Sequence, residues 1–90
     1  MLTVEWFDTA QYVAGAPGLE RLTFQVQLYE TTNVVEFHYC TLNANGATSG
    51  FVTGNSATVG IEALNGTSGT QHSSNQMNAI NTMSGIRFTP

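Results

Sequence analysis

Five polar side chains on two neighbouring segments are the residues of this sequence best placed to bind a ligand. Residues 20–30 alternate strictly between apolar and polar side chains, and residues 34–40 resume the same period. Because alternate residues of a strand share a face, we predict one polar row, formed by Gln25, Gln27, Tyr29, Glu36 and His38. Its amide, phenol, carboxylate and imidazole groups donate and accept the hydrogen bonds that a sugar needs. The alternative is a solvated sheet face without a ligand.

Catalysis is less well supported by the ionisable residues. A hydrolase with paired carboxylates needs two acids about 5–10 Å apart in one cleft, and Glu36 with Glu62 or Glu5 could form such a pair. A nucleophilic site would combine Cys40 or a serine with His38, but a lone cysteine at a strand end is more often a packing residue. The chain has no lysine, which excludes Schiff-base chemistry and a P-loop lysine. We therefore expect no enzyme and no catalytic residues.

Metal ions and cofactors are not expected either. Glu36 and His38 project to the same side of their strand, but no second carboxylate cluster accompanies them. Calcium would have Asp8 as its only aspartate. The single cysteine, Cys40, can form neither an intrachain disulfide nor a cysteine-rich zinc site. If a metal were bound, Glu36 and His38 would be its first ligands.

The charge balance excludes several classes of partner. Charged residues make up 9% of the sequence, the net charge is −4, and Arg21 and Arg87 are the only basic residues apart from two histidines. Nucleic acids bind through several lysine or arginine contacts to phosphate, and anionic membrane surfaces also attract basic segments. No run of about 18 apolar residues suggests a membrane-spanning helix. We expect neither a nucleic-acid partner nor insertion into a membrane.

The two alternating segments are predicted to form the hairpin that positions the polar row. A turn centred on Thr31 and Thr32 places apolar residues opposite apolar residues: Leu28 opposite Val35, Val26 opposite Phe37 and Phe24 opposite Tyr39. The same register places Gln27 opposite Glu36 and Gln25 opposite His38. A slip of one residue would spoil both faces at once, which makes this register strongly specified. Thr-Thr lacks the Asn-Gly chemistry of the favoured two-residue turns, so a longer loop is also open.

The rest of the chain indicates further short strands. Residues 2–8 carry Leu2, Val4 and Trp6 as an apolar set, and we expect Trp6 in the core, with Phe7 pointing the opposite way. The other predicted strands are 57–63, 69–72 and 85–89, with a tight turn at 65–66 between the first two.

The connections between these strands are polar and rich in glycine. Residues 9–18 contain Gly15, Pro17 and Gly18, which disfavour regular structure. Residues 42–56 form a polar loop with Phe51 and Val52 as its only apolar anchor. Residues 73–84 form either a helical turn or an irregular arm. Together these elements predict a single all-β domain over residues 1–90, a small antiparallel β-sandwich or half-sandwich of five to six strands.

Several strands, taken in order, resemble a known family. The fragments are Val4-Glu5-Trp6, residues 24–30, residues 36–39, Ala57-Thr58-Val59-Gly60-Ile61-Glu62 and residues 86–90. They resemble the C-terminal half of nidogen-like β-sandwich modules, which occur in secreted, surface and adhesive proteins of bacteria and in animal matrix proteins. The family's N-terminal half has no counterpart in this sequence.

The resemblance implies an extracellular or cell-surface, non-enzymatic binding or adhesion module. A half-module would expose a sheet face or edge, so we expect completion by a copy of the chain, as a dimer or trimer, or by a neighbouring domain. Phe7, Val34 and Val52 add apolar surface outside the main apolar faces. A glycan or a surface protein is the expected ligand. The alternative is a purely structural spacer, fibre or shell module without a ligand of its own.

Overall fold

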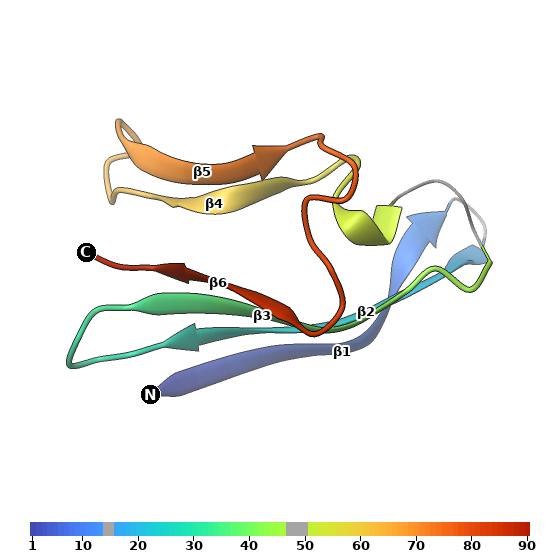
Figure 1. The fold of residues 1–90 in the computed structure, drawn as a ribbon, viewed down its shortest axis with the longest axis horizontal. Helices are drawn as coiled ribbons and strands as arrows, with labels where there is room; N and C mark the ends of the chain where they lie inside the picture. Colours follow the sequence, from blue (N-terminus) through green and yellow to red (C-terminus); the bar gives the residue numbers. More distant parts are fainter. Residues whose placement is uncertain (14–15, 47–50) are drawn as a thin grey trace.

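Six β-strands form two antiparallel sheets in the computed structural model, which describes residues 1–13, 16–46 and 51–90. The main sheet has the strand order β1-β2-β3-β6, and the second sheet is the hairpin β4-β5 (Figure 1). The strand bounds are Leu2–Val13 (β1), Ala16–Leu28 (β2), Val35–Asn43 (β3), Thr58–Glu62 (β4), Gly69–Ser74 (β5) and Ser84–Phe88 (β6). A short 3-10 helix, η1 (Phe51–Thr53), precedes β4. The predicted all-β class and strand number are confirmed.

The β2-β3 hairpin has the predicted register. Leu28 lies opposite Val35, Gln27 opposite Glu36 and Gln25 opposite His38. The connecting loop is longer than two residues, because the Tyr29 amide donates to the Val34 carbonyl at 3.0 Å and the Asn33 amide donates to the Tyr29 carbonyl at 2.9 Å. Asn33 takes the positive φ of 56° that closes this loop. Asparagine tolerates that conformation far better than the β-branched threonines before it.

A β-bulge in β3 ends the simple alternation. Phe24 lies opposite Tyr39, but the next pair is Thr23 with Thr41, so Cys40 is an extra residue in β3. Beyond the bulge, Leu22 lies opposite Leu42. The bulge therefore brings Leu42 to the apolar face, where it packs against the core.

The prediction of an irregular connection over residues 9–18 is wrong for the described part of that segment. β1 continues to Val13 and β2 begins at Ala16, with Tyr12 opposite Pro17. Two register shifts in the pairing of β1 with β2 absorb the irregularity, and at the first of them Asp8 adopts a φ of 49° while its amide donates to Thr23 Oγ1 at 2.9 Å. Pro17 is tolerated because it lies near the start of β2, beyond the last pair that β2 makes with β3. Gly15 lies outside the described residues.

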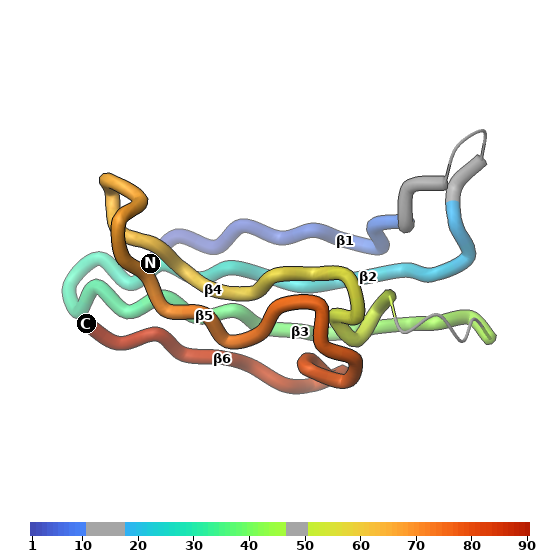
Figure 2. The backbone as a smooth tube through the Cα atoms, turned by 90° about the horizontal axis from the view of Figure 1, so that it is seen from above, coloured from blue at the N-terminus to red at the C-terminus, as the bar shows by residue number. Residues whose placement is uncertain are grey.

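The second sheet packs on the apolar face of the main sheet (Figures 1 and 2). Val59 of β4 joins Tyr39 of β3 and Ile80 in a buried cluster, with Phe24, Phe37, Leu42 and Ile86 packed around it. Residues 75–83 form an irregular arm rather than a helix, and the Ile80 amide donates to the Thr53 carbonyl at 3.2 Å, which fixes the arm on η1. Val52 is buried, which confirms the apolar anchor of the long loop, whereas the expectation that Val52 adds apolar surface is wrong. None of the helical structure in the described ranges is long and apolar enough to cross a bilayer.

The hairpin β4-β5 leaves part of the apolar face uncovered. The uncovered residues, which we call the apolar band, have exposed fractions between 38% and 56%: Leu2, Val4 and Trp6 of β1, and Leu28 of β2. The expectation that Trp6 lies in the core is wrong. Its ring stacks on Phe24 at a centroid distance of 4.8 Å, but 41% of the residue is exposed, because the second sheet does not extend over β1. Phe7, on the opposite side, is 76% exposed.

Candidate functional site

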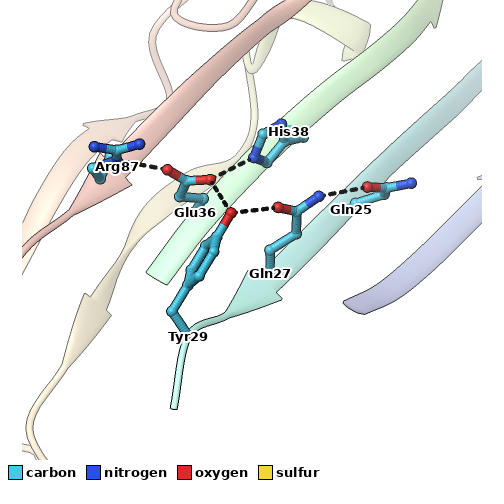
Figure 3. Close-up of polar contacts among 6 residues, drawn as sticks. All are labelled: Gln25, Gln27, Tyr29, Glu36, His38 and Arg87. Atoms are coloured by element: carbon cyan, nitrogen blue, oxygen red, sulfur yellow. Dashed lines mark hydrogen bonds and ion pairs between the residues drawn. The ribbon is translucent and has the colours of Figure 1, made fainter. Parts of the chain in front are cut away.

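The five residues of the predicted polar row lie together on the face of the main sheet that the second sheet does not cover. Gln25 and Gln27 belong to β2, Tyr29 follows the end of β2, and Glu36 and His38 belong to β3. Their apolar neighbours Phe24, Val26 and Phe37 point to the other face, toward β4. Figure 3 shows the five side chains joined in one hydrogen-bonded network. The cross-strand pairing read from the sequence therefore gathers the groups as expected.

Glu36 is the centre of this network. Its Oε1 atom accepts hydrogen bonds from the Tyr29 hydroxyl and from His38 Nε2, both at 2.9 Å, and its Oε2 atom accepts from Arg87 Nε at 2.6 Å (Figure 3). The Glu36 side chain is only 10% exposed, whereas that of Arg87 is 67% exposed. Because a carboxylate only accepts hydrogen bonds, His38 Nε2 carries the proton in this contact. Three donors thus hold one nearly buried carboxylate.

Arg87 is the site residue that the sequence interpretation missed. It lies on β6 directly opposite Glu36. The last strand was predicted, but its pairing with β3 was not, and a five-residue strand gives no register signal strong enough to assign one. The available hint was compositional, because Arg87 is one of only two arginines in a chain without lysine.

The donors around Glu36 shift its ionisation. The hydrogen bond from His38, followed by those from Arg87 and Tyr29, lowers the pKa of Glu36 from 4.5 to about 2, against the opposing effect of partial burial. The same contact raises the pKa of Tyr29 above 10.0, because ionised Tyr29 would lose its hydrogen bond to a carboxylate and face its negative charge. Glu36 is therefore anionic at neutral pH and too weak a base to be suited to proton abstraction.

The network contains a conflict between hydrogen-bond donors and acceptors at Tyr29. Gln25 Nε2 donates to Glu5 Oε1 at 3.0 Å, and Gln27 Nε2 donates to Gln25 Oε1 at 3.1 Å. This order turns the Gln27 carbonyl toward Tyr29, whose hydroxyl lies 3.0 Å from it and 2.9 Å from Glu36 Oε1. A hydroxyl has one proton and can satisfy only one of these acceptors at a time. Glu36 Oε1 also accepts from His38 Nε2, so when Tyr29 donates to Glu36 it is Gln27 Oε1 that has no donor within the polar row.

Of the two acids named from the sequence as partners for Glu36, Glu5 reaches only the far end of the polar row, where its Oε1 atom accepts from Gln25 Nε2. Glu62 lies on β4, in the sheet that packs on the opposite face, and Glu5 is separated from Glu36 by the strand β2. Cys40 is the extra residue of the β3 bulge. Within residues 1–13, 16–46 and 51–90, no three His, Cys, Asp or Glu side chains lie close enough together to hold a metal ion.

A tyrosine titration tests the geometry around Glu36. Tyr29 has a raised pKa because of Glu36, and burial raises the pKa of Tyr39, so both of these tyrosines should ionise above 10.0 in the wild type. In the Tyr29→Phe variant one of these two steps should disappear from the tyrosinate absorbance. In the Glu36→Gln variant the Tyr29 step should move back toward 10.0. An unchanged Tyr29 step in Glu36→Gln would refute the contact.

These observations define the class of protein: a small antiparallel β-sandwich module with a hydrogen-bonded polar face. A family model described as NIDO related matches residues 1–89. The chain belongs to this NIDO-related family, and the nidogen-like resemblance seen in its strands is confirmed. No curated protein and no solved structure matches the chain.

Proposed function

We propose that the chain is a non-enzymatic extracellular module for binding or adhesion, and that its ligand contacts the polar row. The observation that carries this proposal is the gathering of Gln25, Gln27, Tyr29, Glu36 and His38, with Arg87, on the sheet face left open by the second sheet. Membership of a NIDO-related family supports the extracellular setting, since nidogen-like modules occur in secreted and surface proteins.

The chemistry of the polar row suits a neutral or acidic sugar. When the Tyr29 proton is donated to Glu36, a ligand hydroxyl can donate to Gln27 Oε1. Arg87 uses Nε for Glu36 and is largely exposed, so its two terminal nitrogens can donate to a ligand oxygen or carboxylate. Donors and acceptors thus alternate along the face, as a polyhydroxylated ligand requires.

An array of immobilised neutral and carboxylated oligosaccharides tests this proposal. The wild type should bind a defined subset, and Gln27→Ala should bind it less when both are assayed well below their melting temperatures. The loss of two half-buried hydrogen bonds should lower the stability of this variant by about 1 kcal/mol for each bond. The matched control is Gln71→Ala, which removes an exposed glutamine from β5, away from the polar row. Equal binding by wild type and Gln27→Ala, or no binding to any sugar, would contradict a sugar site on this face.

The second candidate is a structural spacer, fibre or shell module. It is favoured by one observation: the hydrogen bonds of the polar row are internal and link β2, β3 and β6 across the sheet. In that case the row braces the sheet, and substitutions in it would lower the melting temperature without abolishing the capture of any sugar.

A further inference from the structure

The chain exposes more surface than a folded monomer of its size should. Its accessible surface is 6053 Å², whereas about 5,100 Å² is expected for a monomer of 9.7 kDa. Its radius of gyration is 14.1 Å, against roughly 12 Å for a compact chain of this length. The excess of about 900 Å² is close to the roughly 800 Å² that each partner buries in a standard stable interface. A single chain therefore exposes about as much additional surface as one partner buries in a stable interface.

Part of the exposed surface is the apolar band, which lies on one side of the molecule. Residues Leu2, Val4 and Trp6 of the apolar band lie directly opposite Leu28, Val26 and Phe24 of β2. Val26 and Phe24 also line a cavity of about 360 Å³ between the two sheets, together with Val59 of β4. The apolar band therefore continues the interior of the sandwich outward, past the point where the second sheet ends.

Two strand edges border this uncovered region. β1 is an outer strand of the main sheet, and in the described part of the chain β4 pairs only with β5. Viewed from above, β4 lies on the β1 side of β5, so its unpaired edge faces the space over β1 (Figure 2). β1 and β4 run in opposite directions along the sandwich (Figure 1). An antiparallel partner for β4 would therefore have the direction of β1.

We infer that two copies of the chain form a dimer in which the apolar band of one copy packs on the apolar band of the other. A two-fold axis parallel to the strands brings β1 of one copy beside β4 of its partner, antiparallel. Each layer then has six strands, namely β5 and β4 of one copy followed by β1, β2, β3 and β6 of the other. This arrangement covers both apolar bands and pairs both open edges, and it closes after two copies.

The strand sequences agree with this pairing. A register with Val59 opposite the partner's Trp6 also places Ile61 opposite the partner's Val4, so apolar residues meet on the inner side. On the outer side Gly60 lies opposite the partner's Glu5 and Glu62 opposite the partner's Thr3. No two acids lie directly opposite each other, although each copy has a net charge of −4. Added salt should therefore strengthen the dimer by screening the long-range repulsion.

Sedimentation equilibrium at micromolar concentration is the first test. The wild type should be a dimer and Val4→Glu a folded monomer, with its fold checked by circular dichroism. The matched control is Met83→Glu, which also places an acid on an exposed apolar side chain but lies on the arm before β6, away from the interface. A monomeric wild type, or a Val4→Glu variant that remains dimeric, would overturn the inference.

Disulfide trapping tests the strand pairing itself. In a Cys40→Ala background, one chain carries Thr3→Cys and the other carries Glu62→Cys, so that the two thiols face each other only between β1 and β4 of different copies. The Cα atoms of directly opposed residues in antiparallel strands lie about 4.5–5.5 Å apart, within the range of Cα separations that a disulfide bridges. The mixture should form a cross-linked dimer on oxidation, and neither chain alone should do so. Cross-linking of the Thr3→Cys chain with itself, or none in the mixture, would overturn this arrangement.

Discussion

The Glu36→Gln variant should be markedly less stable than the wild type at neutral pH, and the difference should vanish in acid. In the folded chain the pKa of Glu36 is lowered to about 2, from 4.5. The folded state therefore favours the carboxylate, and the stability gained from its ionisation is fully present above about pH 4.5. It is lost as the pH falls from there to about 2, because the folded chain then takes up the proton that the unfolded chain already holds.

Melting temperatures measured between neutral pH and about pH 2 provide the test. Glu30→Gln is the matched control, because Glu30 is also paired, with the amino terminus at 3.1 Å, but its side chain is 82% exposed. An exposed ion pair contributes little, so this variant should follow the wild type closely. The burial of Glu36 also means that Glu36→Ala should lower the melting temperature, which a fully solvated polar row would not predict. Parallel pH profiles for wild type and Glu36→Gln would refute the role of Glu36.

The Gly60→Ala variant should be markedly less stable than the wild type, because the second sheet has no room for the added methyl group. A Cβ atom at Gly60 would lie 2.5 Å from the Thr70 carbonyl oxygen and 3.0 Å from the Cα atom of Gln71, both backbone atoms of β5. Backbone atoms cannot turn aside as a side chain can, so β4 and β5 must separate. Overpacking of this kind costs about 1–3 kcal/mol, which corresponds to roughly 4–24 °C in a domain of this size.

Thermal unfolding followed by circular dichroism measures this effect. Gly66→Ala is the control: its φ of 70° makes alanine unfavourable, but no atom lies within 4 Å of the added Cβ. It should cost only about 1 kcal/mol from backbone strain. If both variants melt at the same temperature, the close approach of β4 and β5 does not explain the lower stability of Gly60→Ala.

The hairpin and the polar row could be predicted because two independent constraints agree. Within segment 22–39 the apolar residues and the polar residues specify the same register. A shift by one residue would move apolar side chains to the polar face and polar side chains to the apolar face. The sequence specifies the turn less well, since Thr31 and Thr32 carry no strong turn signal. Asn33, with its positive φ, supplies the conformation that the threonines disfavour.

The features that could not be predicted depend on contacts between distant residues. Glycine and proline at 15–18 indicate a break, yet bulges at Asp8 and beyond let β1 and β2 continue through most of that segment. The partial exposure of Trp6 depends on how far the second sheet extends, which alternation within β1 does not reveal. The pairing of Arg87 with Glu36 likewise requires the position of β6 in the sheet.

The distance in sequence between Glu36 and Arg87 has a consequence for the order of folding. The two residues are 51 positions apart, whereas β2 and β3 are joined by a short loop. Short hairpins close within microseconds, and closing a longer loop costs additional chain entropy before any contact compensates for it. We therefore expect the three strands β1, β2 and β3 to assemble early and β6 to dock last. The Glu36 carboxylate would then pass through the folding transition without its arginine and acquire its final ionisation behaviour only in the closing step.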